Sequence, residues 1–311
     1  IVRRGMRVAV IGAGPAGLAA ANVLNRRGYQ VTVFDKNEAA GGLLRYGIPN
    51  FKLNKAIIDR RLRLLEEEGI HFRLGEEIAA EGLEELAGQE GAVVIATGTP
   101  TARDLNIPGR ELKGVHLALE LLSQQNRELA GIDIPRAERI TAKGKDVLVI
   151  GGGDTGSDCI GTAHRQGCRS VTQIEIMPKP VEGPEDLQNP WPSWPRTLKT
   201  TSSHEEGCTR RWNINTLEFL GDNKLTGAKV QEIDWKPNPD GGRPLMVEKG
   251  NPAIIKAELV LLAMGFMKPE HPEYPENVFV CGDAESGASL VVRAMASGIE
   301  TAKKVDDFLK R

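Results

Sequence analysis

The chain has 311 residues, of which 40% are hydrophobic and 26% are charged, and its formal net charge is −2. This composition is typical of a globular protein with room for two domains, and the near-neutral charge argues against nucleic acid as a main partner. The best apolar run, residues 259–266, has the length of a strand and is too short to span a membrane. We therefore expect a cytoplasmic protein that binds neither nucleic acid nor a membrane.

Residues 8–34 predict a strand, a helix and a second strand, with the glycine-rich turn Gly12-Ala13-Gly14-Pro15-Ala16-Gly17 before the helix. In such a GxGxxG turn the first glycine permits a tight bend, the second lets a pyrophosphate approach, and the third lets the helix pack on the strand. Asp35 ends the second strand, where a carboxylate can accept hydrogen bonds from ribose hydroxyls. Glycine-rich turns also occur for purely structural reasons, but strand, glycines, helix and acid in register favour a dinucleotide site.

Further elements follow in the next hundred residues. Residues 55–68 predict an amphipathic helix with Ile57, Ile58, Leu62, Leu64 and Leu65 on its apolar side. Residues 71–74 predict a short strand, and residues 92–96 predict a buried strand that ends at Thr97-Gly98. The stretch 100–108 is rich in Pro and Gly and predicts a linker that crosses between domains, and residues 115–125 have helical spacing.

A second glycine-rich turn, Gly151-Gly152-Gly153-Asp154-Thr155-Gly156, lies between the predicted strand 147–150 and a predicted helix. Glu175 ends the next strand, as Asp35 does in the first half. Residues 259–266 predict a last strand that reaches Met264-Gly265, the counterpart of Thr97-Gly98. A carboxylate beside a phosphate is unfavourable, so Asp154 either caps its own helix or makes a contact on the nicotinamide side.

The tail predicts a strand at 278–281, then Gly282-Asp283 and a helix from about Leu290. We therefore predict an α/β fold with two Rossmann-like dinucleotide-binding domains, one formed by residues 1–108 and 270–311 and the other by the inserted residues 109–269. A chain that holds two dinucleotides favours hydride transfer between them. That reaction depends on stacking and water exclusion, so we expect no catalytic acid or base among the side chains.

Cysteine and histidine spacing narrows the chemistry further. The four cysteines form no CxxC pair, which argues against a zinc ribbon, an iron–sulfur cluster held by this chain and a redox-active dithiol. The histidines have no metal-ligand spacing, so we expect no metal site.

Longer motifs resemble the small (β) subunit of glutamate synthase, one of the two-dinucleotide flavoprotein reductases. The similar stretches are residues 41–49, 52–53, 151–158, 175–178, 189–195, 261–266 and 289–292. The cysteine-rich domain with iron–sulfur clusters that normally begins this subunit is not in the sequence. The loop 269–275 is shorter than in the family, and residues 285–288 read Glu-Ser-Gly-Ala where the family has Arg-Arg-Gly-Gln.

The resemblance implies FAD in the first domain and NADH or NADPH in the second. It implies that electrons pass to the large subunit of glutamate synthase, or to another acceptor protein with iron–sulfur clusters, for glutamate formation from glutamine and 2-oxoglutarate. The residues it implies at FAD are Gly12, Gly14, Pro15, Ala16, Gly17, Asp35, Lys36, Gly41, Gly42, Leu43, Lys52, Ala96, Thr97, Gly98, Gly282, Asp283, Ser289 and Leu290. Those at the nicotinamide nucleotide are Gly151, Gly153, Asp154, Thr155, Gly156, Glu175 and Gly265.

Other interpretations stay open. The chain could be an inert or regulatory dinucleotide-binding scaffold of a larger redox complex, and a thiol–disulfide reductase is disfavoured because no CxxC is present. Glu175 favours NADH over NADPH, because its carboxylate would bond a free 2′-hydroxyl and repel a 2′-phosphate. Alternatively, Glu175 faces away and Lys179 or Arg165 meets that phosphate, or Glu175 is a surface residue with no ligand. The pairs 205–206 and 210–211 are expected on the solvated surface, and Trp191 and Trp194 are expected to pack under a Pro-rich loop.

Overall fold

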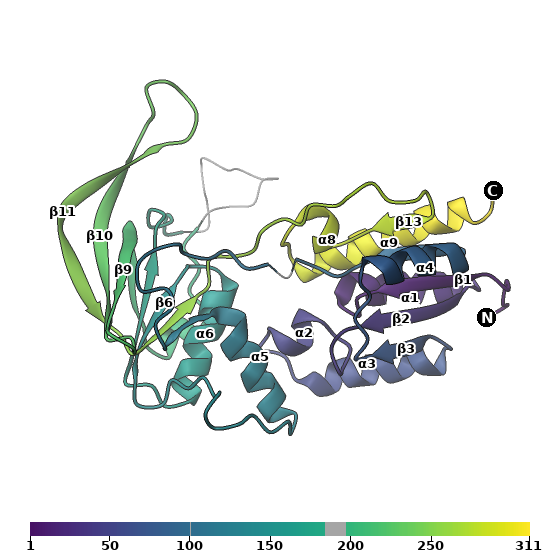
Figure 1. Ribbon diagram of the computed structural model, residues 1–311, viewed down its shortest axis with the longest axis horizontal. Coiled ribbons are helices and arrows are strands. Elements are labelled where there is room, and N and C mark those ends of the chain that lie inside the picture. Colours follow the sequence, from purple (N-terminus) through teal and green to yellow (C-terminus); the bar gives the residue numbers. More distant parts are fainter. Residues whose placement is uncertain (100, 184–196) are drawn as a thin grey trace. The chain divides into compact units, whose positions relative to one another are not determined.

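The structure, a computed structural model, describes residues 1–99, 101–183 and 197–311. The motif at 189–195, with Trp191 and Trp194, lies outside these residues. The chain forms two units, Ile1–Ala102 with Phe266–Arg311 and Arg103–Gly265 (Figure 1). The two crossing segments run antiparallel where they meet: Ala102 and Phe266 form a β-bridge, and the Arg103 N–H donates to the Gly265 carbonyl over 2.9 Å.

The first unit is built on a parallel sheet with the strand order β13-β4-β1-β2-β3. Its strands are β1 (Arg7–Ile11), β2 (Gln30–Asp35), β3 (His71–Leu74), β4 (Ala92–Ile95) and β13 (Val278–Val280). Its helices are α1 (Pro15–Arg26), α2 (Leu43–Tyr46), α3 (Lys55–Glu67), α4 (Ala80–Gln89), α8 (Asp283–Ser286) and α9 (Val291–Phe308). The tail therefore completes the sheet at its β4 edge and supplies the long helix α9.

Alternating strand residues divide the core of the first unit into two layers. Val8 and Val10 pack with α1, α3 and α9, whereas Ala9 and Ile11 pack with α4. The predicted helix at 55–68 is confirmed as α3, but its predicted apolar side is wrong at two positions. Ile57 is 56% exposed and Leu64 is 40% exposed. The helical period places positions 58, 62 and 65 on one face and turns positions 57 and 64 away from it.

The second unit repeats this sheet with the order β5-β12-β6-β7-β8. The strands are β5 (Val115–Leu117), β6 (Asp146–Ile150), β7 (Ser170–Glu175), β8 (Thr209–Trp212) and β12 (Leu259–Leu262). The helices are α5 (Ala118–Leu129), α6 (Asp154–Arg165) and α7 (Ser202–Glu205). The prediction of a helix over 115–125 is wrong for its first three residues, because Val115 pairs with Val260 in the sheet and the helix begins at Ala118.

A third, antiparallel sheet covers one face of the second unit. It contains β9 (Ile214–Leu220), β10 (Gly227–Lys236) and β11 (Leu245–Lys256), and β10 and β11 form the long hairpin in Figure 1. Leu148 and Ile150 pack against this sheet, whereas Val147 and Val149 pack against α5 and α6. In both units a parallel sheet has its glycine-rich turn after the central strand, which confirms the predicted fold class. No helix in the described part of the chain is long and apolar enough to cross a membrane.

A buried carboxylate joins the tail to the first βαβ segment. Asp306 on α9 is 3% exposed and accepts hydrogen bonds from Arg27, from the Tyr29 hydroxyl (2.8 Å) and from Lys310 (2.6 Å). Burial raises the pKa of the Asp306 carboxyl, but the bonds from Lys310 and Tyr29 and the charge of Arg27 outweigh burial and hold the pKa below its usual value. Burial and the bond to Asp306 raise the pKa of Tyr29 to about 12.

We predict that Asp306→Asn lowers the free energy of unfolding at pH 7 by about 2 kcal/mol, because a buried ionised acceptor of three donors is lost. The pKa of Asp306 is lower in the folded chain than in the unfolded chain. Its stabilisation is therefore complete above the unfolded pKa and is lost as the pH falls through the folded pKa. Urea midpoints of wild type and variant should begin to converge below about pH 4 and should meet once the pH is below the folded pKa.

The exposed neighbour Asp307 provides the control, and Asp307→Asn should leave the midpoint unchanged at both pH values. A wild-type advantage over Asp306→Asn that stays constant between neutral and acidic pH would contradict the prediction.

Candidate functional site

The first glycine-rich turn has two positions that no larger residue can occupy and one that opens onto free space. A Cβ atom added at Gly12 would overlap the Ala96 carbonyl, and one at Gly17 would overlap the Gly12 carbonyl. Gly12 also has a φ of 106°, in the left-handed region that favours glycine. A Cβ at Gly14 would meet nothing closer than the Gly42 Cα at 4.0 Å. Packing alone therefore requires glycine at the first and third positions, whereas a Cβ at the middle position would clash with no protein atom.

The second turn has the same geometry. A Cβ at Gly151 would overlap the Ala263 carbonyl, and one at Gly156 would lie 2.5 Å from the Gly151 carbonyl oxygen. A Cβ at Gly153 would meet no atom within 4 Å. Gly14 and Gly153 are the N-cap residues of α1 and α6, and neither helix start has a side-chain cap. Each turn therefore presents helix N–H groups beside open space, which fits a pyrophosphate.

Two acidic side chains lie against these turns. Asp35 accepts hydrogen bonds from the Ala13 N–H (2.7 Å) and the Asn37 N–H (2.9 Å). Glu175 accepts one from the Met177 N–H (3.3 Å), and its Oε2 lies 2.6 Å from where a Cβ at Gly152 would be. Each carboxylate thus faces the residue between the first two glycines. The short aspartate accompanies alanine there, and the longer glutamate accompanies glycine.

The structure shows where Arg165 and Lys179 lie, the two cations considered as partners for a 2′-phosphate. Arg165 lies at the last turn of α6, far along the helix from the glycine turn, and forms an ion pair with Glu206 at 2.8 Å. Lys179 pairs with Glu182 and lies over the Trp212 ring, 5.4 Å from its centroid. Glu175 therefore faces the turn, which removes the interpretation that it faces away, and Arg165 is not placed to meet a ribose phosphate.

Near Glu175, Trp212 was missed at the sequence level and Arg210 was placed wrongly. Trp212 on β8 pairs in register with Glu175 on β7, and Arg210 lies over the Trp212 ring at 5.1 Å from its centroid. Arg210 and Arg211 are both partly buried, which corrects their predicted place on the solvated surface, and burial lowers the pKa of the Arg210 guanidinium. The only sequence signal was the short segment Thr209–Trp212. Its two arginines are typical of a surface loop, so the strand was not predicted.

Other parts of the first unit close on its turn. The Gly41 N–H donates to the Ala13 carbonyl (2.8 Å), and a Cβ at Gly42 would lie 2.8 Å from the Gly14 Cα. Leu43 begins α2 in this loop. The Lys55 ammonium donates to the carbonyls of Leu44 and Ile48 and so fixes the loop that the 41–49 motif encodes. Lys36 forms an exposed pair with Glu77 at 3.8 Å, and Lys52 lies exposed after the loop.

The tail approaches the same helix start. A Cβ at Gly282 would lie 2.6 Å from the Ala16 Cβ, and one at Gly298 would overlap the Ala16 carbonyl. Helices α1 and α9 therefore cross closely at Ala16 (Figure 1). Asp283 accepts a hydrogen bond from the Ser289 hydroxyl over 2.6 Å, and Leu290 is the N-cap residue of α9. Gly298 was missed, although a glycine inside a predicted helix is a sign of close packing.

The strand ends that follow the two turns also correspond. Ala96 supplies the carbonyl against Gly12, and Ala263 supplies the one against Gly151. Gly98, after Thr97, has a φ of 72°, and Gly265 has a φ of 85°. Asp154 is exposed at the first position of α6 and makes no capping hydrogen bond, which removes one of its two interpretations, and Thr155 follows in the same turn.

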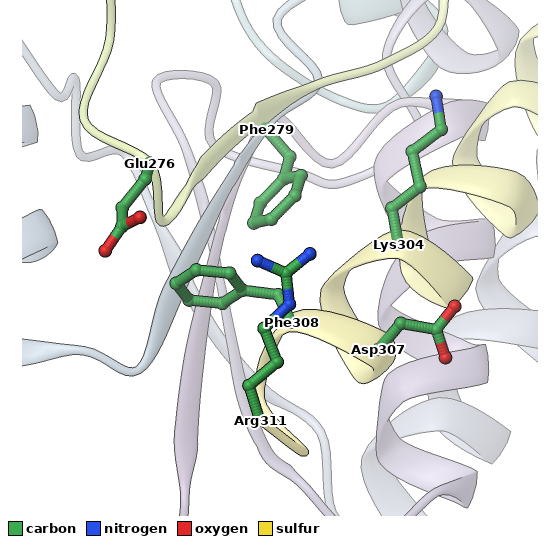
Figure 2. A pocket seen from close by; sticks show the side chains of 6 residues that line it. All are labelled: Glu276, Phe279, Lys304, Asp307, Phe308 and Arg311. Atoms are coloured by element: carbon green, nitrogen blue, oxygen red, sulfur yellow. The ribbon is translucent and has the colours of Figure 1, made fainter.

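A hollow of about 340 Å³ in the first unit lies away from these residues (Figure 2). Glu276 precedes β13 there, Phe308 is the last residue of α9, and Arg311 lies three positions beyond it. It is therefore at the amino ends of the parallel strands, opposite the edge where such sheets bind dinucleotides. Among the residues that the structure describes, no group of His, Cys, Asp and Glu could hold a metal ion.

Sequence comparisons agree with this geometry. The family model for pyridine nucleotide-disulphide oxidoreductases matches residues 6–271. The small chain of glutamate synthase [NADPH] from Mycobacterium tuberculosis is 43% identical over 98% of this chain and 67% of its own length. The chain belongs to the glutamate synthase small-chain branch of this oxidoreductase family. The Bacillus subtilis small chain is 39% identical over 99% of this chain and 68% of its own length, and glutamate synthase [NADH] of Saccharomyces cerevisiae is 39% identical over 99% of this chain but 16% of its own length.

Solved structures show the same fold at lower identity. Mycobacterium tuberculosis FprA in complex with NADPH superposes with a TM-score of 0.78 at 16% identity, over 99% of this chain and 85% of that chain. Thioredoxin reductase from T. acidophilum gives 0.65 at 20% identity, over 96% and 97%. The family confirms the predicted activity: the chain is an oxidoreductase that uses FAD and a nicotinamide nucleotide, and the inert-scaffold interpretation is not favoured.

The cysteines are poorly suited to carry the electrons. None of the four cysteines, all within the described residues, forms a disulfide, and burial raises the pKa of Cys208 to about 11 and that of Cys281 to about 12. Burial also raises the pKa of Cys168. The thiolate is the reactive form, so these groups stay protonated at neutral pH.

We predict that iodoacetamide at pH 8 alkylates Cys208 and Cys281 at least about tenfold more slowly in the folded chain than in urea, because both the thiolate fraction and access fall. Mass spectrometry of tryptic peptides measures both rates. Rapid alkylation of either residue in the folded chain would show that its thiol is ionised and accessible.

Proposed function

We propose that the first unit, residues 1–102 with 266–311, holds FAD and that the inserted unit, residues 103–265, binds the nicotinamide nucleotide. The observation that carries this proposal is the duplicated turn, in which packing forces the outer glycines and the middle glycine opens onto a helix N-terminus. The first turn has additional protein around it, from the 41–49 loop and from the tail at Gly282 and Gly298. Such enclosure suits a cofactor that stays bound, whereas the simpler second turn suits a nucleotide that exchanges.

The chain's own residues would bind and orient the two dinucleotides. FAD supplies a ring that accepts a hydride from the reduced nicotinamide. The N-terminal N–H groups of α1 and α6 would hold the pyrophosphates, and Asp35 and Glu175 lie where ribose hydroxyls would be bonded. Asp283, held by Ser289, would bond the ribityl chain, and the N-terminus of α9 at Leu290 would stabilise negative charge on the reduced ring.

We further propose that the electrons leave for a separate, larger subunit with iron–sulfur clusters, as part of a glutamate synthase. The chain spans about two thirds of the length of the small chains that it matches. In the yeast protein the matching region is joined to a much longer polypeptide, which supports a working partner for the same module here. The absence of a disulfide between the four described cysteines supports a reducing compartment such as the cytoplasm.

The direct test is the colour of the purified chain. Wild type should absorb at about 450 nm, as oxidised flavins do, and should bleach anaerobically on addition of NADH or NADPH. Gly14→Val should fold but lose the flavin, because a Cβ at position 14 meets no protein atom closer than 4.0 Å and the side chain would occupy the space that the pyrophosphate needs. Absorbance and the thermal midpoint measure the two effects separately.

The third glycine of the same turn provides the contrast. Gly17→Val should destabilise the whole unit, since its Cβ would overlap the Gly12 carbonyl. Full flavin occupancy in a folded Gly14→Val would sink the assignment of FAD to this turn.

We propose NADH as the preferred nucleotide. The Glu175 carboxylate faces the turn, where it would bond a free 2′-hydroxyl and repel a 2′-phosphate. Two cations lie against Trp212, the strand neighbour of Glu175, and both are engaged with other groups. Lys179 is already paired with Glu182, and Arg210 lies on Trp212. The names of the relatives include both NADPH and NADH, so the family alone does not decide the nucleotide.

We predict that Glu175→Gln lowers the NADH/NADPH ratio of kcat/KM by about tenfold, the effect of about 1.4 kcal/mol of lost discrimination. Gly152→Ala should shift the ratio in the same direction, because its added Cβ would displace the Glu175 carboxylate. Adding Glu175→Asp to Gly152→Ala copies the alanine–aspartate pair of the first turn and should recover part of the ratio. Wild type that prefers NADPH, or a ratio unchanged in both single variants, would remove Glu175 from nucleotide selection.

A further inference from the structure

Two buried polar side chains lie next to the second glycine turn. Gln173 on β7 is 2% exposed and His204 on α7 is 8% exposed. In the first unit the corresponding position is apolar: Val33 pairs with Val10, as Gln173 pairs with Val149. Burying amide and imidazole groups costs free energy unless their hydrogen bonds are made, so the second unit requires a specific set of partners here.

The partners form one continuous chain of hydrogen bonds. The Gln173 amide Nε2 donates to the Gly151 carbonyl (2.9 Å), and Gln173 Oε1 lies 3.1 Å from His204 Nε2. The Thr201 N–H donates to His204 Nδ1 over 3.1 Å. The Thr201 hydroxyl lies 2.9 Å from the same Nδ1 and 2.6 Å from the Ser157 hydroxyl.

The backbone donor fixes the direction of the chain. Because His204 Nδ1 accepts the Thr201 N–H, the ring proton is on Nε2 and is donated to Gln173 Oε1. The Gln173 carbonyl is then the acceptor, which leaves its NH₂ group to donate to Gly151. The Thr201 N–H and hydroxyl share the one lone pair of Nδ1, and the Thr201 hydroxyl oxygen then accepts a hydrogen bond from the Ser157 hydroxyl, so the series is continuous from Gly151 to Ser157.

This series of hydrogen bonds begins and ends on opposite sides of the second glycine turn. Gly151 directly follows β6. Ser157 lies in the first turn of α6, where its N–H donates to the Gly153 carbonyl (3.1 Å). The network therefore closes a ring around residues 151–157. The Gly151 carbonyl oxygen lies against the start of α6, 2.5 Å from where a Cβ at Gly156 would be. The Gln173 amide reaches this oxygen from β7 and donates a hydrogen bond to it.

We propose that Gln173, His204, Thr201 and Ser157 are positioning residues that hold the second glycine turn in its nucleotide-binding shape before the nucleotide arrives. The proposal rests on the proposed function of the second unit as the nicotinamide-nucleotide site. A nucleotide that leaves after each turnover must find the turn ordered again, and any cost of ordering lowers its affinity. A permanently bound cofactor keeps its own turn ordered, which explains why Val33 suffices in the first unit.

The test replaces Gln173 with methionine, which keeps the length of the side chain and removes both hydrogen bonds. ADP-ribose is the probe, since it carries the pyrophosphate and both riboses but cannot exchange a hydride. Gln173→Met should raise its Kd by calorimetric titration about tenfold, the size expected for one buried hydrogen bond. Exchange of the amide hydrogens at 151–157 should quicken in the ligand-free protein, and KM for the nucleotide should change more than kcat.

Gln124 provides a matched control in the same unit. It is 8% exposed and makes two hydrogen bonds to Ile140, at 2.7 and 2.8 Å, with none to the turn. Gln124→Met should lower stability to a similar extent and leave the Kd of ADP-ribose unchanged. Equal losses of affinity in the two glutamine variants, or unchanged exchange at 151–157 in Gln173→Met, would overturn the proposal.

A milder pair keeps the test valid if Gln173→Met does not fold. Ser157→Ala opens the ring at its far end and should weaken ADP-ribose binding about threefold. Its control is Ser203→Ala, because the buried Ser203 hydroxyl has no hydrogen-bond partner among the described residues. A wild type that does not bind ADP-ribose would instead overturn the proposed function, whereas wild-type binding with no difference between Ser157→Ala and Ser203→Ala would overturn only the positioning role.

Discussion

The close approach of backbone to backbone at the two glycine turns is the constraint on which the rest of the molecule depends. Gly12 lies against Ala96 and Gly17 against Gly12, so the strand, the turn and the helix meet without any side chain between them. The same contacts recur at Gly151, Ala263 and Gly156. This compactness aims each helix N-terminus at the space beside the middle glycine. Without this close approach, Asp35 on β2 and Glu175 on β7 would not lie against the glycine turns.

The two units use this constraint differently. In the first, the residue between the first two glycines is Ala13, its N–H is bonded by Asp35, and the tail closes on Ala16. In the second, Gly152 leaves space for the Glu175 carboxylate, and the hydrogen-bond network that starts at Gln173 supports the turn. One repeated βαβ frame thus supports one enclosed site and one open site, which is the difference expected between a resident cofactor and an exchanging substrate.

The parts that were predictable from the sequence are those decided by one residue and its near neighbours. Gly12 and Gly151 are required by local sterics, and Asp35 and Glu175 follow at a fixed distance along one βαβ unit. Contacts between distant segments could not be read in this way. His204 meets Gln173 across 31 positions, and Arg210 lies on a strand whose place beside β7 depends on the whole sheet. Val115–Leu117 has helical spacing in isolation and becomes a strand because an edge of the sheet is available.

The division of the first unit into two segments affects the order in which the protein can fold during synthesis. The inserted unit is contiguous, so all of its strands have left the ribosome when residue 265 has emerged. The first unit at that time lacks β13 and α9, and the edge of β4 has no neighbour. Only after Gly298 has been translated can α9 settle on Ala16 and close the first turn. The first unit, to which we assign the cofactor, is therefore completed last, after the inserted unit, to which we assign the nucleotide.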